Sequence, residues 1–260
     1  MTVPRIAFNH LAGSAHLPLL VVGPSLGTSV AALWTPAARL VGDTHCVVGW
    51  DLPGHGASPP PRAPFSVGDL SQAVAASVQL EFGAPFTYAG VSVGGAVGLD
   101  MMLNHQGCVL AAALICTGAV IGSAADWHAR AERVRADGTA TLVQLARQRW
   151  FAPGFAESQP QTAAGLLDSL CEADDEGYAL LCEALAQFDM RERLTNIQTP
   201  VLAVAGRHDV ATPPKSLLEI STRVRDGRFI ELPCAAHLAP AERPRRIAQL
   251  VASLTERGSR

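Results

Sequence analysis

The sequence predicts an α/β protein with a doubly wound, mostly parallel sheet and one inserted helical region. Short, almost continuous apolar runs alternate with segments of helical periodicity, as expected for a parallel sheet covered on both faces. Residues 121–197 break this alternation, because they contain no convincing strand pattern. We therefore expect a core made of residues 1–120 and 198–260, and a helical cap made of residues 121–197.

Six segments have the length and composition of buried strands. They are residues 17–23, 45–50, 86–91, 110–118, 200–206 and 228–233. Helical periodicity is clearest in residues 67–82, 96–106 and 241–257. Residues 121–197 are instead rich in Ala, Leu, Arg, Glu and Asp. Because open α/β sheets bind ligands beyond the carboxyl ends of their strands, an insertion at such an end is expected to cover the ligand site.

Composition limits the class of protein. The 260 residues are 48% hydrophobic and 17% charged, which allows a large core and excludes a disordered chain. A formal net charge of −3 gives no reason to expect nucleic acid or an anionic membrane as a partner. We find no signal peptide pattern and no apolar run long enough to span a bilayer. The six cysteines form no C-x-x-C pair, so reduced thiols in a cytoplasmic protein, monomeric or homo-oligomeric, are expected.

Residues 88–98, YAGVSVGGAVG, surround one serine with glycines. Ser92 lies between an expected strand and an expected helix, and Gly90 and Gly94 lie two residues to either side. G-x-S-x-G at such a junction is typical of a nucleophile elbow, a sharp turn that exposes the serine hydroxyl. The N–H of Val93 would then begin a helix, where a developing oxyanion is stabilised. The alternative is a glycine-rich turn with a passive serine.

Two further residues complete a predicted catalytic triad. Asp209 and His237 each follow an expected strand, in the chain order serine, acid, histidine. A serine is a weak nucleophile unless a base takes its proton and a third group orients that base. Taken alone, Asp209 could be a turn or helix-capping residue and His237 a surface histidine. The three residues in this order favour catalysis.

Two loops beside the expected strands carry further glycines. The loop at residues 21–34 is expected to provide the second oxyanion donor, the backbone N–H of Leu26, opposite that of Val93. The turn at residues 50–60, WDLPGHGASPP, is expected to be structural. Its Asp51, His55 and Ser58 side chains can hold such a turn by hydrogen bonds.

With these motifs placed, the chain resembles the α/β-hydrolase superfamily over nearly its whole length. Within it, the sequence is most similar to the 3-oxoadipate enol-lactonases. The similarity lies in PSLGTS (24–29), DLPGHGAS (51–58), GVSVGG (90–95), AGRHDVATPP (205–214) and AAHLAPAERP (235–244), and in the cap phrases DWHARAERVRADG (126–138), RWFAP (149–153) and DDEGYALLCEALAQFDMRERL (174–194). Many relatives have His-Gly where this chain has Pro24-Ser25, and Gly23-Pro24 replaces a more usual polar pair.

The resemblance implies hydrolysis of 3-oxoadipate enol-lactone to 3-oxoadipate, a step in bacterial degradation of aromatic compounds (the β-ketoadipate pathway). Ser92 would attack the lactone carbonyl, His237 would take the proton, and Asp209 would hold the imidazole. No metal and no organic cofactor are expected. The partner is then a small, carboxylate-bearing lactone.

The cap is expected to contact that carboxylate. Residues 126–149 contain five arginines and three acidic residues, so this stretch is basic within an acidic protein. Trp127 and Arg130 share one face of an expected helix, and arginine binds carboxylates through paired hydrogen bonds. We expect substrate contacts from Trp127, Arg130, Arg133 and Ser25. A solvated, arginine-rich helix with a packing tryptophan is the alternative.

Other functions fit the same framework. A general carboxylesterase, a C–C bond hydrolase and a cofactor-free perhydrolase would all use the same triad, so only the cap pocket could separate them. A ligand-binding receptor could keep the fold without useful turnover. The complete set of triad residues argues against the receptor.

Overall fold

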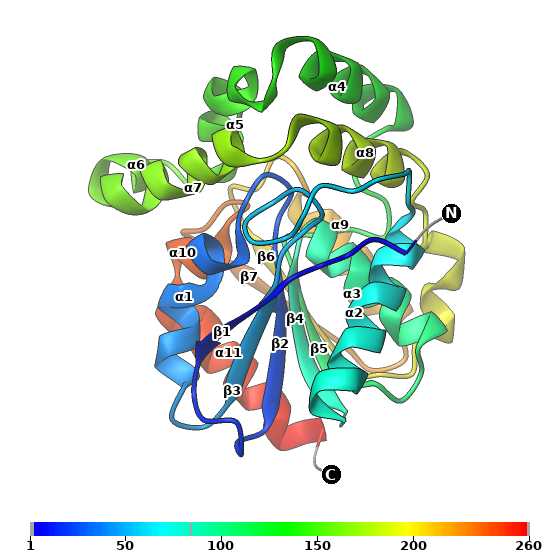
Figure 1. The fold of residues 1–260 in the computed structure, drawn as a ribbon. Helices are drawn as coiled ribbons and strands as arrows, with labels where there is room; N and C mark the ends of the chain where they lie inside the picture. Colours follow the sequence, from blue (N-terminus) through cyan, green and yellow to red (C-terminus); the bar gives the residue numbers. More distant parts are fainter. Residues whose placement is uncertain (1–2, 84, 259–260) are drawn as a thin grey trace.

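A seven-stranded sheet covered by helices on both faces forms the core of the computed structural model, which describes residues 3–83 and 85–258 (Figure 1). The strands are β1 (Phe8–Ala12), β2 (Leu19–Gly23), β3 (Cys46–Trp50), β4 (Phe86–Val91), β5 (Val109–Ile115), β6 (Val201–Gly206) and β7 (Gly227–Leu232). Their order across the sheet is β1-β3-β2-β4-β5-β6-β7. Only the β1–β3 pair is antiparallel, which confirms the expected mostly parallel sheet.

All six expected strands are confirmed, but β1 was not predicted. Its sequence, FNHLA, is half-buried or exposed at every position, and it pairs only with β3 at the edge of the sheet. An edge strand needs little apolar surface, so it lacks the pattern that marks the central strands. The strand expected at 110–118, which is β5, also ends early, at Ile115, because the chain turns sharply at Cys116, where φ is 46°.

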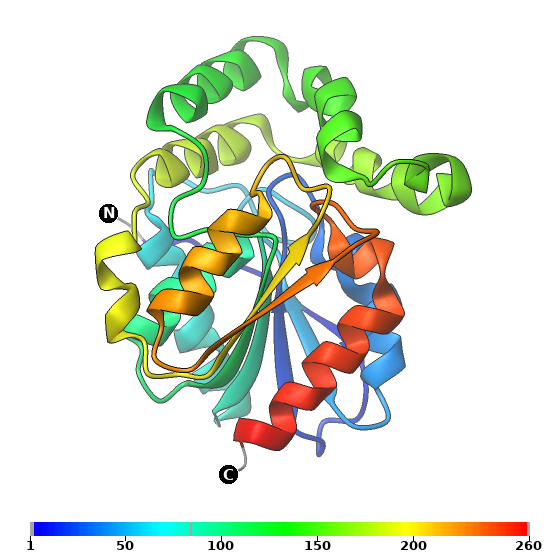
Figure 2. The same ribbon diagram turned by 180° about the vertical axis from the view of Figure 1, so that it is seen from behind.

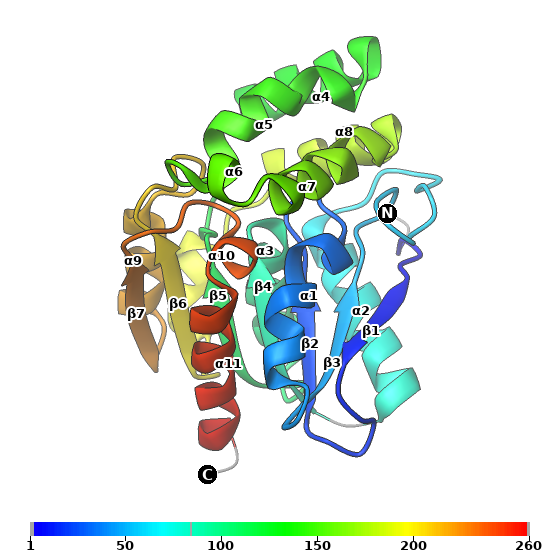
Figure 3. The same cartoon turned by 90° about the vertical axis from the view of Figure 1, so that its left-hand side faces the viewer.

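Helices cover the two faces of the sheet unequally. One face carries α1 (Val30–Val41) and α11 (Pro244–Gly258), which pack against each other, as Figure 3 shows. The opposite face carries α2 (Val67–Phe82), α3 (Val93–Asn104) and α9 (Pro214–Arg223). The expected helix at 67–82 has the bounds of α2, and a capping box between Ser66 and Asp69 begins it.

The helical cap comes between β5 and β6 in the chain. In space it lies over the carboxyl ends of the strands (Figure 2). Residues 121–197 are all described, and they contain helices but no strand. The elements are α4 (Ala124–Asp137), η1 (Thr139–Leu142), α5 (Val143–Trp150), α6 (Phe155–Ser158), α7 (Pro160–Glu172), α8 (Asp175–Ala186) and η2 (Arg191–Asn196). Arg135 of α4 pairs with Glu176 and Glu183 of α8, at 2.8 and 2.5 Å. The division of the chain into core and cap at these boundaries stays a prediction.

The turn after β3 is held by Asp51. This carboxylate is 2% exposed and accepts three hydrogen bonds, from the amide of Val30 (2.7 Å), the side chain of Asn9 (2.8 Å) and the amide of Ala57 (3.0 Å). Ser58 donates to the carbonyl of Asp51 at 2.7 Å. Asp51 therefore joins β1, α1 and the turn, which is the structural role expected for it.

His55 connects the same turn to the helical cap. Its ring is 1% exposed and stacks on Tyr178 of α8, with ring centroids 6.0 Å apart. Burial lowers the pKa of His55 to about 4, although a hydrogen bond with the carbonyl of Pro53 opposes this shift. The ring is therefore neutral near pH 7 and serves as a packing surface beneath the cap.

Glu242, at the end of α10 (Ala239–Glu242), fastens the cap to the loop that follows β7. Its carboxylate is 5% exposed and accepts hydrogen bonds from the amides of Ala152 in the cap (2.7 Å) and Ala236 (2.9 Å). The carbonyl of Trp150 accepts a further bond from the amide of His237 at 3.2 Å. Burial raises the pKa of Glu242, and the two amides only partly oppose this rise.

Replacing Asp51 by alanine should destabilise the fold by about 2–4 kcal/mol, because three donors, of which the amide of Val30 is buried, lose their acceptor. Asp51→Asn keeps one acceptor oxygen and should cost clearly less. Urea unfolding of both variants measures the difference, with the exposed Asp43→Ala as control. A loss in Asp51→Ala no larger than that of the control would contradict the structural role.

Glu242→Gln should change how stability depends on pH. A carboxyl group whose pKa is raised in the folded state binds more protons there than in the unfolded chain, so its contribution is full below the unfolded pKa and is lost as pH rises through the folded value. The stability of wild type minus that of Glu242→Gln should therefore decrease as the pH rises above the pKa of an unfolded glutamate, about 4.3. Urea titrations from that pH upward test this. A constant or increasing difference would show that burial does not raise this pKa.

Candidate active site

Ser92 occupies a strained turn between β4 and α3. Its φ of 55° and ψ of −117° lie outside the regions that side chains ordinarily favour, and such a conformation costs about 1–3 kcal/mol. The flanking glycines make this turn possible. A Cβ atom on Gly90 would lie 2.7 Å from the nitrogen of Gly95, and one on Gly94 would lie 2.7 Å from the carbonyl oxygen of Pro24. The glycines expected from the elbow motif are thus required by the space.

Hydrogen bonds from three directions hold the turn. The amide of Ser92 donates to the carbonyl of Ile115 at 3.0 Å. The carbonyl of Ser92 accepts from the hydroxyl of Thr117 at 2.7 Å. The amide of Gly94 donates to the carbonyl of Pro24 at 3.0 Å. The elbow is therefore attached both to the end of β5 and to the loop after β2.

Asp209 and His237 form a buried pair. Nδ1 of His237 and Oδ2 of Asp209 are 2.9 Å apart, and the two residues are 4% and 3% exposed. The carboxylate also accepts from the amide of Ala211 (2.8 Å) and from the amide and hydroxyl of Thr212 (2.9 and 2.7 Å). Burial raises the pKa of Asp209, but attraction to His237 and these hydrogen bonds outweigh burial and place the pKa below its usual value.

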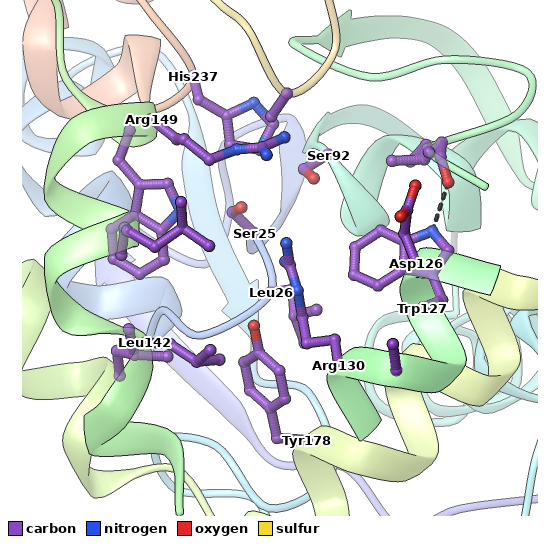
Figure 4. A pocket seen from close by; sticks show the side chains of 18 residues that line it. Ser25, Leu26, Ser92, Asp126, Trp127, Arg130, Leu142, Arg149, Tyr178 and His237 are labelled. Carbon is purple, nitrogen blue, oxygen red and sulfur yellow. Dashed lines mark hydrogen bonds between the residues drawn. The ribbon is translucent and has the colours of Figure 1, made fainter. Parts of the chain in front are cut away.

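The ionisation of Asp209 determines which nitrogen of His237 is basic. An ionised carboxylate can only accept hydrogen bonds, so Nδ1 must carry the proton in this pair. In the neutral tautomer with its proton on Nδ1, Nε2 is the unprotonated nitrogen and can act as a base. His237 and Ser92 line the same pocket, and Figure 4 shows both side chains at one end of it.

That pocket lies between the core and the helical cap and has a volume of about 350 Å³. The core contributes Ser25, Leu26, Ser92, Ala211 and His237. The cap contributes apolar side chains together with Asp126, Trp127, Arg130, Arg149, Trp150 and Tyr178. A concave, largely apolar site with a few polar groups is suited to a small organic ligand.

The two predicted oxyanion donors, the amides of Val93 and Leu26, come from α3 and from the loop after β2. Val93 is the first residue of α3, so its amide has no partner within the helix. Leu26 lines the pocket in the loop after β2. In that loop the amide of Ser25 donates a hydrogen bond to the hydroxyl of Thr28 at 3.2 Å. The same hydroxyl donates to the carbonyl of Ser25 at 2.9 Å. Ser25 thus cannot offer its amide, which favours Leu26; the assignment stays a prediction.

Of the three cap residues expected to contact substrate, two line the pocket and one does not. Trp127 and Arg130 line the pocket, and the Arg130 guanidinium carbon lies 4.9 Å from the centroid of the Trp127 ring. Arg133 does not line it, and its expected substrate contact stays a prediction. Its guanidinium is exposed and donates to the carbonyl of Thr141 at 3.4 Å. Arg133 lies six residues after Trp127, which at 3.6 residues per turn places it about 120° around the helix from that residue, away from the pocket.

Arg149 was not predicted as a ligand contact, although it falls within the basic stretch 126–149. It projects from the last turn of α5 into the pocket, and Figure 4 shows it at the end where Ser92 and His237 lie. Arg130 and Arg149 are both half-buried, and neither forms an ion pair with a carboxylate in the described part of the chain. Burial raises the pKa of Tyr178, while these two positive charges partly oppose the rise.

The described residues contain no metal cluster, disulfide or membrane-spanning helix. Within residues 3–83 and 85–258, no three His, Cys, Asp or Glu side chains are close enough together to hold a metal ion. All six cysteines are described, and each is a free thiol. In the same part of the chain, no helix combines the length and hydropathy needed to cross a bilayer.

Comparison with known proteins agrees with the fold and with the resemblance seen in the sequence. The model of the alpha/beta hydrolase family matches residues 19–250. The chain is 32% identical to 3-oxoadipate enol-lactonase 2 of Acinetobacter baylyi, over 99% of this chain and 96% of that protein. It is 29% identical to 3-oxoadipate enol-lactonase 1 of the same organism, over 92% and 88% of the two chains.

Solved structures show the similarity in three dimensions. The enol-lactonase from Burkholderia xenovorans LB400 superposes with a TM-score of 0.91 and 29% identity, covering 95% of each chain. An esterase from Thermogutta terrifontis superposes with a TM-score of 0.89 at 22% identity, which shows the common fold alone. The predicted α/β-hydrolase fold and the resemblance to enol-lactonases are therefore confirmed. The chain belongs to the alpha/beta hydrolase family and is a hydrolase.

Proposed function

We propose that the protein opens 3-oxoadipate enol-lactone to 3-oxoadipate, with Ser92, His237 and Asp209 as its catalytic triad. The observation that carries this proposal is the pocket itself. It brings Ser92 and His237 together with two guanidinium groups that have no carboxylate partner among the described residues. The names of the two Acinetobacter relatives support the same substrate. The role in bacterial aromatic degradation and the cytoplasmic location belong to this proposal.

In the proposed mechanism, Ser92 Oγ attacks the lactone carbonyl while Nε2 of His237 removes its proton. Asp209 stabilises the imidazolium that forms, since its carboxylate is ionised and hydrogen-bonded to Nδ1. The amides of Leu26 and Val93 would stabilise the oxyanion. Ring opening releases an enolate that becomes a ketone, and the acyl chain remains on Ser92. Water, activated by His237, then frees the second carboxylate.

Arg130 and Arg149 would bind the carboxylate that the lactone already carries. Guanidinium groups bind carboxylates through two hydrogen bonds. Trp127 restrains Arg130, because the cation lies over its ring, and the ring itself is fixed by a hydrogen bond from its Nε1 to the carbonyl of Ile121. A neutral ester would gain little from either arginine. A general carboxylesterase and a lactonase of acidic substrates are therefore distinguishable by charge.

Ser92→Ala should reduce turnover of the enol-lactone by a factor on the order of a million, because a triad without its nucleophile loses nearly all of its advantage. Steady-state rates measure the loss, and circular dichroism confirms that the variant is folded. Ser253→Ala, on the far helix α11, is the control. Retention of more than a few per cent of turnover would mean that Ser92 is not the nucleophile. Tight binding without turnover in wild type would instead indicate a receptor.

Arg130→Ala and Arg149→Ala should each lower kcat/KM for the lactone by roughly ten- to a thousand-fold, because a desolvated ion pair is worth about 2–5 kcal/mol when one partner is removed. Hydrolysis of p-nitrophenyl acetate, which carries no carboxylate, should change by less than about threefold. Arg133→Ala, outside the pocket, should leave both substrates within the same limit. Parallel losses on both substrates would show that the variants only disturb the cap.

A further inference from the structure

The end of β5 lies between the two parts of the candidate site. In the sheet, β5 is flanked by β4, which leads to Ser92, and by β6, which leads to Asp209. Cys116 and Thr117 directly follow β5, and both are fully buried.

Each of the two side chains makes one hydrogen bond to a different catalytic loop. The hydroxyl of Thr117 donates to the carbonyl of Ser92 at 2.7 Å. The thiol of Cys116 donates to the carbonyl of Ala236, the residue before His237, at 3.2 Å. Adjacent residues therefore join the backbone of the nucleophile to the backbone that carries the base.

The backbone at Cys116 is held in an unfavourable conformation to make this connection. Among the described residues, only Ser92 and Cys116 combine a side chain with a clearly positive φ, and that of Cys116 is 46°. Its amide donates to the carbonyl of Val204 in β6 at 2.9 Å. Backbone strain of this kind persists only where the surrounding structure enforces it, and it occurs most often at functional sites.

The packing around the two residues leaves little free space. A Cβ atom on Gly95 would lie 2.6 Å from Cβ of Thr117, so the first turn of α3 rests directly on that side chain. A Cβ atom on Gly206 would collide with the carbonyl oxygen of Ala236. Burial raises the pKa of the Cys116 thiol well above its usual value, with the Asp209 charge adding to the effect. The thiol thus keeps the proton that it donates.

We propose that Cys116 and Thr117 are positioning residues that set the separation between Ser92 and His237. The proposal rests on the proposed triad. Ser92 and His237 come from loops more than a hundred residues apart in the chain, and proton transfer requires their side chains to meet within hydrogen-bond distance. A misplacement of about 1 Å can cost on the order of a hundredfold in rate. The two bonds from one dipeptide fix both loops against the same strand.

The test separates this role from simple core packing by comparing variants of matched volume. Thr117→Val removes the hydroxyl and keeps the shape, whereas Thr117→Ser keeps the hydroxyl. Thr44→Val is the control, because its hydroxyl also bonds to a carbonyl, that of Val41 at 3.1 Å, in a turn outside the pocket. The readouts are kcat and KM for p-nitrophenyl acetate, their pH profile, and the midpoint of urea unfolding.

We expect Thr117→Val to lower kcat about five- to fiftyfold and to change KM less than about twofold, because orientation rather than binding is disturbed. Thr117→Ser should regain most of the lost rate. Cys116→Ala should act in the same direction with a smaller effect, since a thiol is a weak donor, and Cys116→Ser should regain rate relative to it. If Thr117→Val does not fold, the Cys116 pair decides the question by the same comparison.

The proposal is overturned if kcat of folded Thr117→Val stays within about twofold of wild type. It is also overturned if the serine variants lose as much rate as the variants without a donor, since bulk rather than the hydrogen bond would then be responsible. These outcomes are distinct from a failure of the proposed function. In that case Ser92→Ala itself would retain turnover, whatever the behaviour of Thr117→Val.

Discussion

The strained turn at Ser92 is the constraint on which the rest of the site depends. A side chain at φ 55° and ψ −117° is unfavourable by about 1–3 kcal/mol, so the fold must hold it there. It does so with hydrogen bonds from the end of β5 and the loop after β2, and with glycines where any Cβ would collide. The same contacts place the loop carrying Leu26 opposite the beginning of α3. The geometry of the elbow and that of the expected oxyanion donors are therefore consequences of one turn.

His237 is tied to part of the cap by a separate set of hydrogen bonds. Trp150, a wall of the pocket, accepts a hydrogen bond from the amide of His237, and Glu242 bonds the amides on either side of this junction, Ala152 and Ala236. Separating the cap at Trp150 and Ala152 from the loop at His237 would leave buried polar groups unpaired, which is costly in free energy. The pocket wall at Trp150 and the proposed base, His237, are thus parts of one hydrogen-bonded structure.

Charge is distributed in keeping with this arrangement. The chain as a whole is acidic, yet the cap presents Arg130 and Arg149 to the pocket. Asp209, the acid of the proposed triad, is shielded by burial and fully hydrogen-bonded, so it stays ionised beside His237 without competing for the arginines. Behind the pocket, His55 is kept neutral by burial. Asp126 also lines the pocket but pairs with neither arginine among the described residues, so the positive charge of Arg130 and Arg149 is left available to an anionic ligand.

The sequence by itself determined the features that depend on local pattern. Buried parallel strands are continuous apolar runs, and the elbow at Ser92 requires glycines at fixed spacing, so both could be predicted without a structure. The edge strand β1 could not, because an exposed strand has no such pattern. Only the tertiary structure decided that Arg149 rather than Arg133 lies in the pocket. Helical periodicity shows which residues share a face, but the rotation of each helix about its axis is set by packing against its neighbours.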